Sequence, residues 1–286
     1  MSAPLNVSSP SSLKDIVEII GDWDVPDGDV AKPITIMHPP GNGLFLIVQY
    51  RTPIRASWQF GRETEVCSEY QFAATQVQSG AVSINPTGPL GVMAIYLKPE
   101  AAISVLGSLK EFMNIKVDLR DIFRPSELER LHELLVQSRQ SSQRVAHIEA
   151  FLVQNARRAP RTSVAQHAAR SLRSRPGLHL SRLAVEMGIS ARHLSRAFQE
   201  SFGVGPKRFA KVARIEKVMA GRREGLTWAD ISYACGFCDQ SHMIRDFKEI
   251  VGKSPTEFFQ PTGDGGAPLL VGGSNLTFTI TKTDEQ

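Results

Sequence analysis

The sequence contains little cysteine and no long hydrophobic run. Its three cysteines are an odd number in a chain that opens without a cationic leader and apolar run, so a disulfide framework is not expected and the thiols should be reduced. No segment approaches the roughly 18 uninterrupted apolar residues that cross a membrane. We therefore expect a soluble, cytoplasmic protein with no membrane partner.

Catalytic motifs are also missing. The chain has no glycine-rich phosphate loop and no nucleophile elbow, and its seven histidines form no close pair with carboxylate support. Cys235 and Cys238 are spaced like a metal or redox pair, but no second pair completes four zinc ligands and no βαβ setting surrounds them. We predict no enzyme, no metal and no cofactor, and we interpret these two cysteines as small, partly buried apolar side chains.

Positive charge is concentrated in one third of the chain. Residues 155–259 contain 19 Lys/Arg against 9 Asp/Glu, a net charge of +10, whereas residues 1–154 carry −4 and residues 260–286 carry −2. A compact region with this excess suits a polyanionic partner, and the alternative is an ordinary solvated basic surface.

The front half indicates an α+β protein whose residues 1–154 form a β-rich, barrel-like sensor or dimerisation domain. Short β-type runs (ITIM, LFLIVQYRT, ASWQF, QFAATQV, AVSINP, VMAIYLKP) are separated by Pro and Gly, which is typical of a small barrel or sandwich. A helix is predicted from Pro99 to Gly107. Two more follow, with apolar faces at Leu128, Leu131, Leu134 and Leu135 and at Val145, Ile148, Phe151 and Leu152. These helices should cover the β core, and their spare face could also form a homodimer contact.

The aromatic residues, the linker and the tail leave alternatives open. Tyr50, Trp58 and Tyr96 could line a pocket for a small effector, although aromatic residues on strands more often belong to the core. Residues 155–162 have the polar, Pro-containing composition of a linker. Residues 260–286 form a Gly-rich tail that is expected to be mobile, and whether its strand-like LTFTI segment docks on the front domain stays open.

An internal repeat organises residues 163–259. Arg196, Phe198, Gly203, Pro206 and Phe209 recur 49 residues later as Arg245, Phe247, Gly252, Pro255 and Phe258. Upstream, Leu180, Leu183 and Gly188 correspond to Trp228, Ile231 and Gly236, so the second copy has one extra residue in its turn.

Each copy is interpreted as a helix-turn-helix, that is, two short helices joined by a tight turn that contains glycine. Ser190 and Asp239 are predicted to be the N-caps of the second helices, and Gly203 and Gly252 should end them. Pro206 and Pro255 stand where proline begins a helix, and the segment PKRFAKVARIEKVMAG predicts a helix that connects the two units. The C-terminal region is therefore predicted to be an all-α domain of two units joined by a helix.

The second helix of each unit carries polar residues opposite its apolar stripe. Arg, Gln, Ser and His are side chains that contact base edges in the major groove, whereas an ordinary surface more often carries Glu and Lys. Two copies would enter successive major-groove segments about 34 Å apart. The candidate DNA-binding residues are Arg192, Ser195, Arg196 and Gln199 in the first unit and Gln240, Ser241, His242 and Arg245 in the second, with Lys207 and Lys211 as phosphate contacts.

The pattern over residues 163–259 resembles the tandem helix-turn-helix domain of the arabinose-regulator (AraC/XylS-type) transcription factors. The segment GFCDQSHMIRDFKEIVGKSP is similar to the signature of that family, with Ser232 and Met243 as departures that alter packing only slightly. The resemblance implies base-reading positions at Arg192, Ser195 and Arg196 in the first unit and at Ser241, His242 and Arg245 in the second. More weakly, GVMAIYLKPEAAISVLG and the two helices after it resemble the front domain of one branch of these regulators.

These features predict a bacterial regulator that binds double-stranded DNA and contacts RNA polymerase, cytoplasmic and associated with the nucleoid. Control by a small effector bound to the front domain is a further expectation, as is a homodimer. One alternative is an enzyme or alkyl acceptor fused to a DNA-binding module with Cys67 as nucleophile, which the acidic residues around Cys67 disfavour. Another is a protein-binding helical adaptor without DNA activity.

Overall fold

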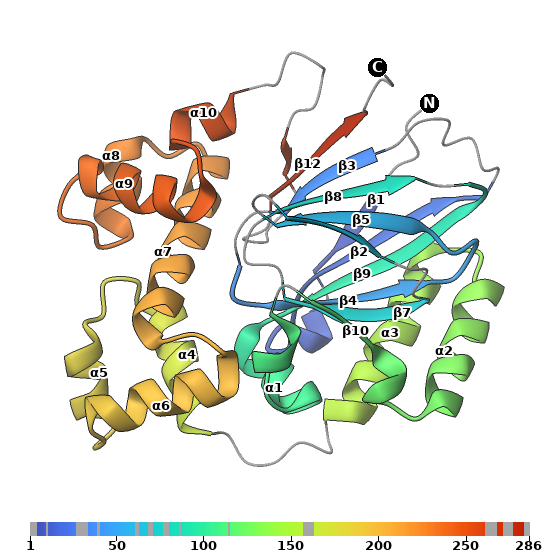
Figure 1. The fold of residues 1–286 in the computed structure, drawn as a ribbon, viewed down its shortest axis with the longest axis horizontal. Helices are drawn as coiled ribbons and strands as arrows, with labels where there is room; N and C mark the ends of the chain where they lie inside the picture. Colours follow the sequence, from blue (N-terminus) through green and yellow to red (C-terminus); the bar gives the residue numbers. More distant parts are fainter. Residues whose placement is uncertain are drawn as a thin grey trace.

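The structure, a computed structural model, describes residues 5–9, 11–26, 34–38, 41–60, 63–67, 71–76, 80–85, 87–113, 115–156, 163–260, 268–270 and 277–282. Among these residues, ten β-strands of the front part and two of the C-terminal tail form two six-stranded sheets, and a group of helices lies beside them (Figure 1). The predicted α+β class is therefore confirmed.

The first sheet contains the central strands of the front part. β4 is buried along nearly its whole length, which shows that both faces of this sheet are covered. Its strands, in spatial order and paired antiparallel, are β1 (Leu5–Ser8), β2 (Val17–Val25), β9 (Leu90–Leu97), β4 (Leu44–Gln49), β7 (Phe72–Thr75) and β10 (Lys116–Asp118).

The second sheet includes part of the tail, because β12 pairs antiparallel with β3. This pairing resolves the question that the sequence left open about the LTFTI segment. The strands, in order, are β11 (Pro268–Leu270), β12 (Thr277–Lys282), β3 (Ile34–His38), β8 (Gly80–Asn85), β5 (Arg55–Phe60) and β6 (Glu63–Cys67). Each sheet keeps two edges among the described strands, so the expected barrel-like domain is a pair of open sheets and not a closed barrel.

Helices follow the strands where the sequence predicted them. The front part has α1 (Pro99–Leu106), α2 (Pro125–Gln137) and α3 (Ser141–Ala156), with short 3-10 turns η1 (Ser11–Leu13), η2 (Lys110–Phe112) and η3 (Leu119–Asp121). Arg144 of α3 is buried and donates to Asp22 of β2 at 2.9 Å, while the Tyr50 hydroxyl donates to the same carboxylate at 2.8 Å. This buried ion pair attaches α3 to the sheet. α3 also continues through Ala156, two residues into the predicted linker, and residues 157–162 of that linker lie outside the described residues.

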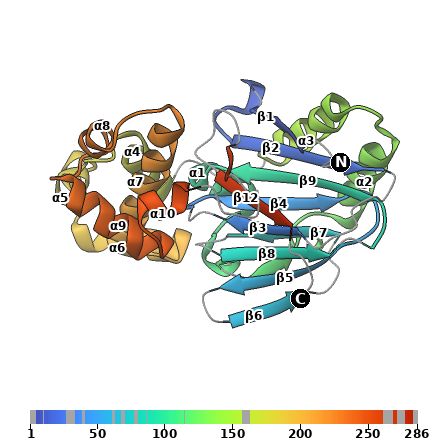
Figure 2. The same ribbon diagram turned by 90° about the horizontal axis from the view of Figure 1, so that it is seen from above.

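The helical part consists of α4 (Val164–Ser174), α5 (Leu180–Glu186), α6 (Ala191–Phe202), α7 (Pro206–Arg223), α8 (Trp228–Ala234), α9 (Gln240–Val251) and α10 (Pro255–Phe259). Figure 1 shows α7 running from the α4–α6 group to the α8–α10 group, and Figure 2 shows both groups on the same side of the sheets. Buried residues of α4, α5 and α6 continue the hydrophobic core of the front part, whereas the core around α8 and α9 is separate. The first helical group is thus fixed to the sheets through α1 and α4.

Candidate nucleic-acid interface

The two predicted units adopt the same local structure. In the first, Gly188 takes a φ of 64°, and the Ile189 N–H donates to the Ala184 carbonyl at 3.0 Å. In the second, Gly236 takes a φ of 72°, and the Phe237 N–H donates to the Ser232 carbonyl at 3.0 Å. Left-handed backbone at both positions explains why glycine stands in each turn. Both units are therefore helix-turn-helix structures built by one set of local rules.

The second helix of each unit begins and ends as predicted. The Ser190 side chain accepts from a backbone N–H at the start of α6, and the Asp239 side chain does the same for α9. Gly203 and Gly252 end these helices with φ values of 69° and 83°. Because caps and turns repeat, α6 and α9 take equivalent places in their units.

Equivalent aromatic rings pack in both cores. Phe198 and Phe209 are 5.2 Å apart between ring centroids at an interplanar angle of 73°, and their counterparts Phe247 and Phe258 are 5.8 Å apart at 69°. Edge-to-face packing of this kind adds to the burial of the rings. The pairs fix the angle at which each second helix meets the helix that follows it.

Asp246 ties the second unit to α7. It is 5% exposed and lies 3.1 Å from Lys211 Nζ and 3.2 Å from Arg214 Nη2, while His242 Nε2 is 3.7 Å away. The Arg214 guanidinium also stacks over the Phe237 ring at 4.9 Å. This network holds α9 against the connecting helix.

Seven of the eight candidate base-reading residues are exposed. His242 is half-buried, and its ring packs edge-on against Phe237 at 5.4 Å. The Gln199 side-chain amide donates to the Gly203 carbonyl at 2.9 Å, and Arg196 lies 3.9 Å from Glu200. The exposed residues are Arg192, Ser195, Arg196 and Gln199 on α6 and Gln240, Ser241 and Arg245 on α9.

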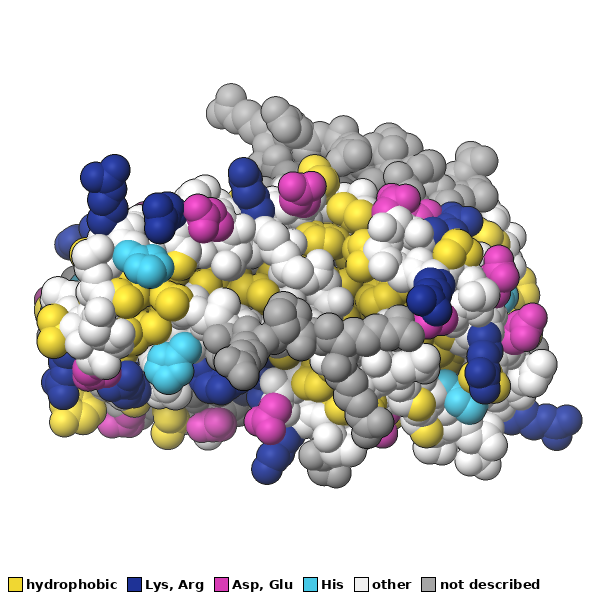
Figure 3. All heavy atoms as spheres, turned by 90° about the horizontal axis from the view of Figure 1, so that it is seen from below, with side chains coloured by type: hydrophobic (Ala, Val, Ile, Leu, Met, Phe, Trp, Pro, Cys, Tyr) yellow, Lys and Arg dark blue, Asp and Glu magenta, His cyan; other side chains and the backbone are white. Residues whose placement is uncertain are grey.

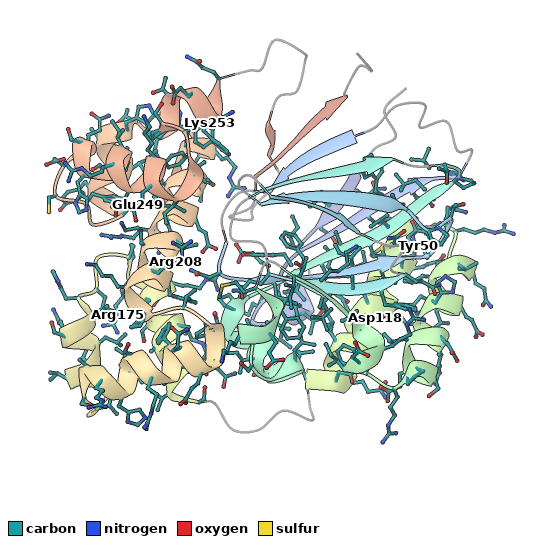
Figure 4. The ribbon with its side chains drawn as sticks, viewed as in Figure 1. Tyr50, Asp118, Arg175, Arg208, Glu249 and Lys253 are labelled. Carbon is teal, nitrogen blue, oxygen red and sulfur yellow. The ribbon has the colours of Figure 1, made fainter. Side chains whose placement is uncertain are left out.

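The two candidate phosphate contacts differ in their surroundings. Lys207 is exposed on the first turn of α7. The Lys211 side chain is 18% exposed, and its Nζ lies 2.7 Å from Glu249 Oε2 and 3.1 Å from Asp246 Oδ1. Figure 4 labels Glu249 on α9. Lys211 therefore binds carboxylates within the protein, and a phosphate would have to compete with them.

The repeat places two further residues of α9 at positions equivalent to candidate base-reading residues of α6. Applying the 49-residue offset to Ser195 and Gln199 gives Ile244 and Lys248, both exposed, and Ile244 is one of the few large apolar side chains with high exposure. The offset was the signal that could have found them.

The cysteines and aromatic residues also differ in part from expectation. Cys235 is buried, and desolvation raises the pKa of its thiol to about 11, whereas Cys238 is exposed and not partly buried. No group of three His, Cys, Asp or Glu side chains is placed to hold a metal ion in the part of the chain that the structure describes. Tyr50 and Tyr96 are core residues at 3% and 2% exposure, while the side chains of Trp58 and Cys67 lie outside the described residues.

Charge is mixed on the face that Figure 3 shows. Lys and Arg side chains of the helical part lie there among Asp and Glu side chains, so the positive charge is not gathered into one patch on this face. Within the described residues, no helix has both the length and the apolar character to span a membrane.

Comparison with known proteins agrees with this geometry. Residues 183–261 match a protein-family model described as a helix-turn-helix domain. A transcriptional regulator of Staphylococcus aureus, described as uncharacterized and of the helix-turn-helix type, is 35% identical over 86 residues. That match covers 28% of this chain and 11% of the relative. The C-terminal part of the chain is thus a helix-turn-helix domain, as the duplicated pattern predicted.

Solved structures also match this chain. ToxT from Vibrio cholerae matches with 12% identity and a TM-score of 0.48, covering 84% of this chain and 96% of that one. A probable AraC family transcriptional regulator from Rhodopseudomonas palustris matches with 26% identity and a TM-score of 0.29, covering 32% of this chain and 91% of that one. The expected resemblance is confirmed by the match of residues 183–261 to the helix-turn-helix family model.

Proposed function

We propose that the protein is a sequence-specific DNA-binding transcription regulator that contacts two successive major-groove segments. The observation that carries this proposal is the equivalence of α6 and α9, which begin and end alike, pack alike, and carry an exposed arginine at the same place, Arg196 and Arg245. An arginine fork can bind guanine through two hydrogen bonds, each good contact contributing about 1–3 kcal/mol of discrimination. α6 and α9 are then the recognition helices.

We assign the reading positions by equivalence between the units. Arg192, Ser195, Arg196 and Gln199 of α6 correspond to Ser241, Ile244, Arg245 and Lys248 of α9. Gln240 and His242 stay proposed contacts beside them. Ile244 is the informative difference, because an exposed apolar side chain on a recognition helix fits the methyl group of thymine.

Contacts with the phosphate backbone of DNA are assigned to cations that lie outside the base-reading positions of α6 and α9. Lys207, exposed at the start of α7, is the proposed phosphate contact in the first unit. Lys211 is kept as a weaker candidate because of its carboxylate partners. Replacing Lys207 by Ala should weaken binding to all sequences and reduce the slope of log K against log salt by about one, whereas the Lys211 variant should change the slope less.

The remaining assignments follow from this function. A regulator of this kind acts in the cytoplasm with the nucleoid, contacts RNA polymerase, and has no catalytic role; a small effector on the front part and a homodimer are further proposals. The position of Cys235 supports a structural role, because a buried thiol with a raised pKa is a poor nucleophile.

Selection of bound fragments from a random duplex pool tests the function directly. The expected product is one motif with two conserved segments about 10 base pairs apart, enriched with or without cell extract as a source of effector. A pool that is not enriched under either condition, or retention that does not depend on salt, would contradict DNA recognition and favour the protein-binding adaptor.

The role of Ile244 has its own test. In the selected site, replacement of single thymines by deoxyuracil removes only the methyl group. Loss of one methyl contact is worth about 0.8 kcal/mol, so one replacement should weaken the wild type roughly fourfold and leave Ile244→Ser unaffected. Ser195→Ala on α6 is the matched control, since it should keep the full response to that deoxyuracil. Equal responses in the wild type and Ile244→Ser would remove this contact.

A further inference from the structure

A buried polar cluster joins α7 to the loop before β4. Glu216 of α7 is 5% exposed, and its Oε1 accepts from the Asn42 N–H at 2.9 Å. The Tyr96 hydroxyl lies 3.4 Å from the same oxygen, and the side-chain amide of Asn42 donates to the Phe209 carbonyl at 2.9 Å. The loop thus holds the connecting helix at two points along its length.

The loop approaches this closely because glycines flank Asn42. A Cβ atom on Gly41 would clash with the Tyr96 hydroxyl, and one on Gly43 would clash with Tyr96 and with the backbone of Leu97. The Gly43 N–H donates to the Tyr96 hydroxyl at 2.8 Å. Glu216, Asn42, Tyr96 and the two glycines are called the latch below.

Glu216 lies in a group of charged side chains in which Arg173 is paired with two other carboxylates. Arg173 of α4 lies 2.6 Å from Glu18 and 3.1 Å from Glu100, and no salt bridge reaches Glu216 from any residue that the structure describes. The charged and titratable groups around Glu216, from every element packed on it, are Glu18 (β2), Tyr96 (β9), Glu100 (α1), Arg170 and Arg173 (α4) and Lys217 (α7).

Glu216 can exchange its proton with water although it is buried. Desolvation raises the pKa of its carboxyl to about 7, with Glu18 and Glu100 adding to the rise and Arg173 and the Asn42 N–H opposing it. A cavity of about 230 Å³ between α1, α4 and α7 has Glu216 on its wall. Two hydrogen bonds reach the Glu216 carboxyl from the described residues around it, from the Asn42 N–H and the Tyr96 hydroxyl, and Oε1 accepts both.

We propose that the latch is a proton-controlled contact between the sheets and the DNA-binding part. The neutral Glu216 carboxyl docks α7 on the loop at residues 41–43, and loss of its proton to water in the cavity weakens this docking. α7 carries Phe209 in the first core and Ile215 in the second, so releasing it changes the restraint on both recognition helices together. Control of DNA binding by the latch rests on the proposed function, whereas the pH-dependent docking of α7 on the loop does not.

The sign and size of the effect follow from linkage. A carboxyl whose pKa is raised in the docked state favours docking at low pH, and this advantage is lost as pH rises from 4.5, the ordinary value, through about 7. If the opened state restores the ordinary value, the ratio of docked to opened molecules should fall roughly tenfold between about pH 6 and about pH 8.

Amide hydrogen exchange measured by NMR on the full chain tests the proposal. The probes are the Asn42 and Gly43 amides, and the Lys98 amide, which donates to the Ile16 carbonyl at 2.9 Å in the front part, is the internal reference. Relative to Lys98, protection of the probes should fall roughly tenfold from about pH 6 to about pH 8 in the wild type. In Glu216→Gln, which mimics the neutral carboxyl, protection should stay at its low-pH value. Gly41→Ala should open the latch at both pH values without unfolding the Lys98 region.

The proposal would be overturned if the Asn42 and Gly43 amides keep the same protection relative to Lys98 at both pH values. It would also be overturned if Glu216→Gln keeps the pH dependence of the wild type. DNA binding is measured in parallel on the selected site. Affinity that changes between the two pH values in the wild type, but not in Glu216→Gln, supports control of DNA binding by the latch. Exchange that behaves as expected with no DNA binding at all would leave the latch standing and reject the proposed function instead.

Discussion

The helix crossing of the second unit contains a polar atom whose removal should stabilise the protein. Ser232 of α8 is 4% exposed, and its hydroxyl oxygen is buried with no hydrogen-bond partner among the described residues. The equivalent position of the first unit is Ala184, also 4% exposed. Since the backbones around the two residues make the same turn, alanine should fit at 232 without rearrangement.

The expected gain can be worked from two contributions. A buried hydroxyl without a partner costs about 1–3 kcal/mol, and serine is roughly 0.5 kcal/mol less favourable than alanine inside a helix. Ser232→Ala should therefore raise the free energy of unfolding by about 1.5–3.5 kcal/mol, and the reciprocal Ala184→Ser should lower it by a similar amount.

Urea unfolding followed by circular dichroism measures both variants, with an unchanged dependence on denaturant expected. Ser195→Ala, on the exposed face of α6, is the matched control and should stay within about 0.5 kcal/mol of the wild type. A Ser232→Ala variant that is less stable than the wild type would refute the reasoning, because the hydroxyl would then have a partner, such as a backbone carbonyl of its own helix.

Three further predictions concern other contacts. Arg144→Ala leaves the buried Asp22 carboxylate without its guanidinium and should destabilise the protein by about 3–5 kcal/mol in urea unfolding, and a loss below about 1 kcal/mol would contradict the buried pair. Gly252→Ala should cost about 1 kcal/mol, the backbone term alone, whereas Gly203→Ala should cost more because its Cβ would lie 3.2 Å from the backbone Cα of Lys110 and would displace the end of Met113, so equal losses would be inconsistent with this packing. Thiol labelling of the folded protein, read by mass spectrometry, should modify Cys238 before Cys235, and the reverse order would show that the second turn is opened in solution.

The helical part could be predicted from sequence because its signals are local. Each of these signals acts within a few residues: the N-caps such as Ser190 and Asp239, the glycines with positive φ, and the prolines at helix starts. Because the unit is repeated, each signal occurs twice in the sequence. The proposed reading face of α9 could be predicted only in part, since Ile244 is apolar and only its alignment with Ser195 places it on that face.

The front part was less predictable because its decisive contacts are distant in sequence. β2 was missed since Glu18, Asp22 and Asp24 break its apolar pattern, and their partners, Arg173, Arg144 and Arg51, come from elsewhere in the chain. The docking of α4 on α1 and the contact of Glu216 with Asn42 also join segments more than sixty residues apart. The hydrophobic periodicity of one segment does not indicate which distant segment it will contact.

Base preference of two single-arginine variants tests the central claim most directly. Binding of Arg196→Ala and of Arg245→Ala to every single-base change of the selected site should show relaxed preference at different positions, in segments about 10 base pairs apart, with each lost contact worth about 1–3 kcal/mol. If both variants relax the same positions, or neither relaxes any, then α6 and α9 are not two equivalent readers of one DNA site.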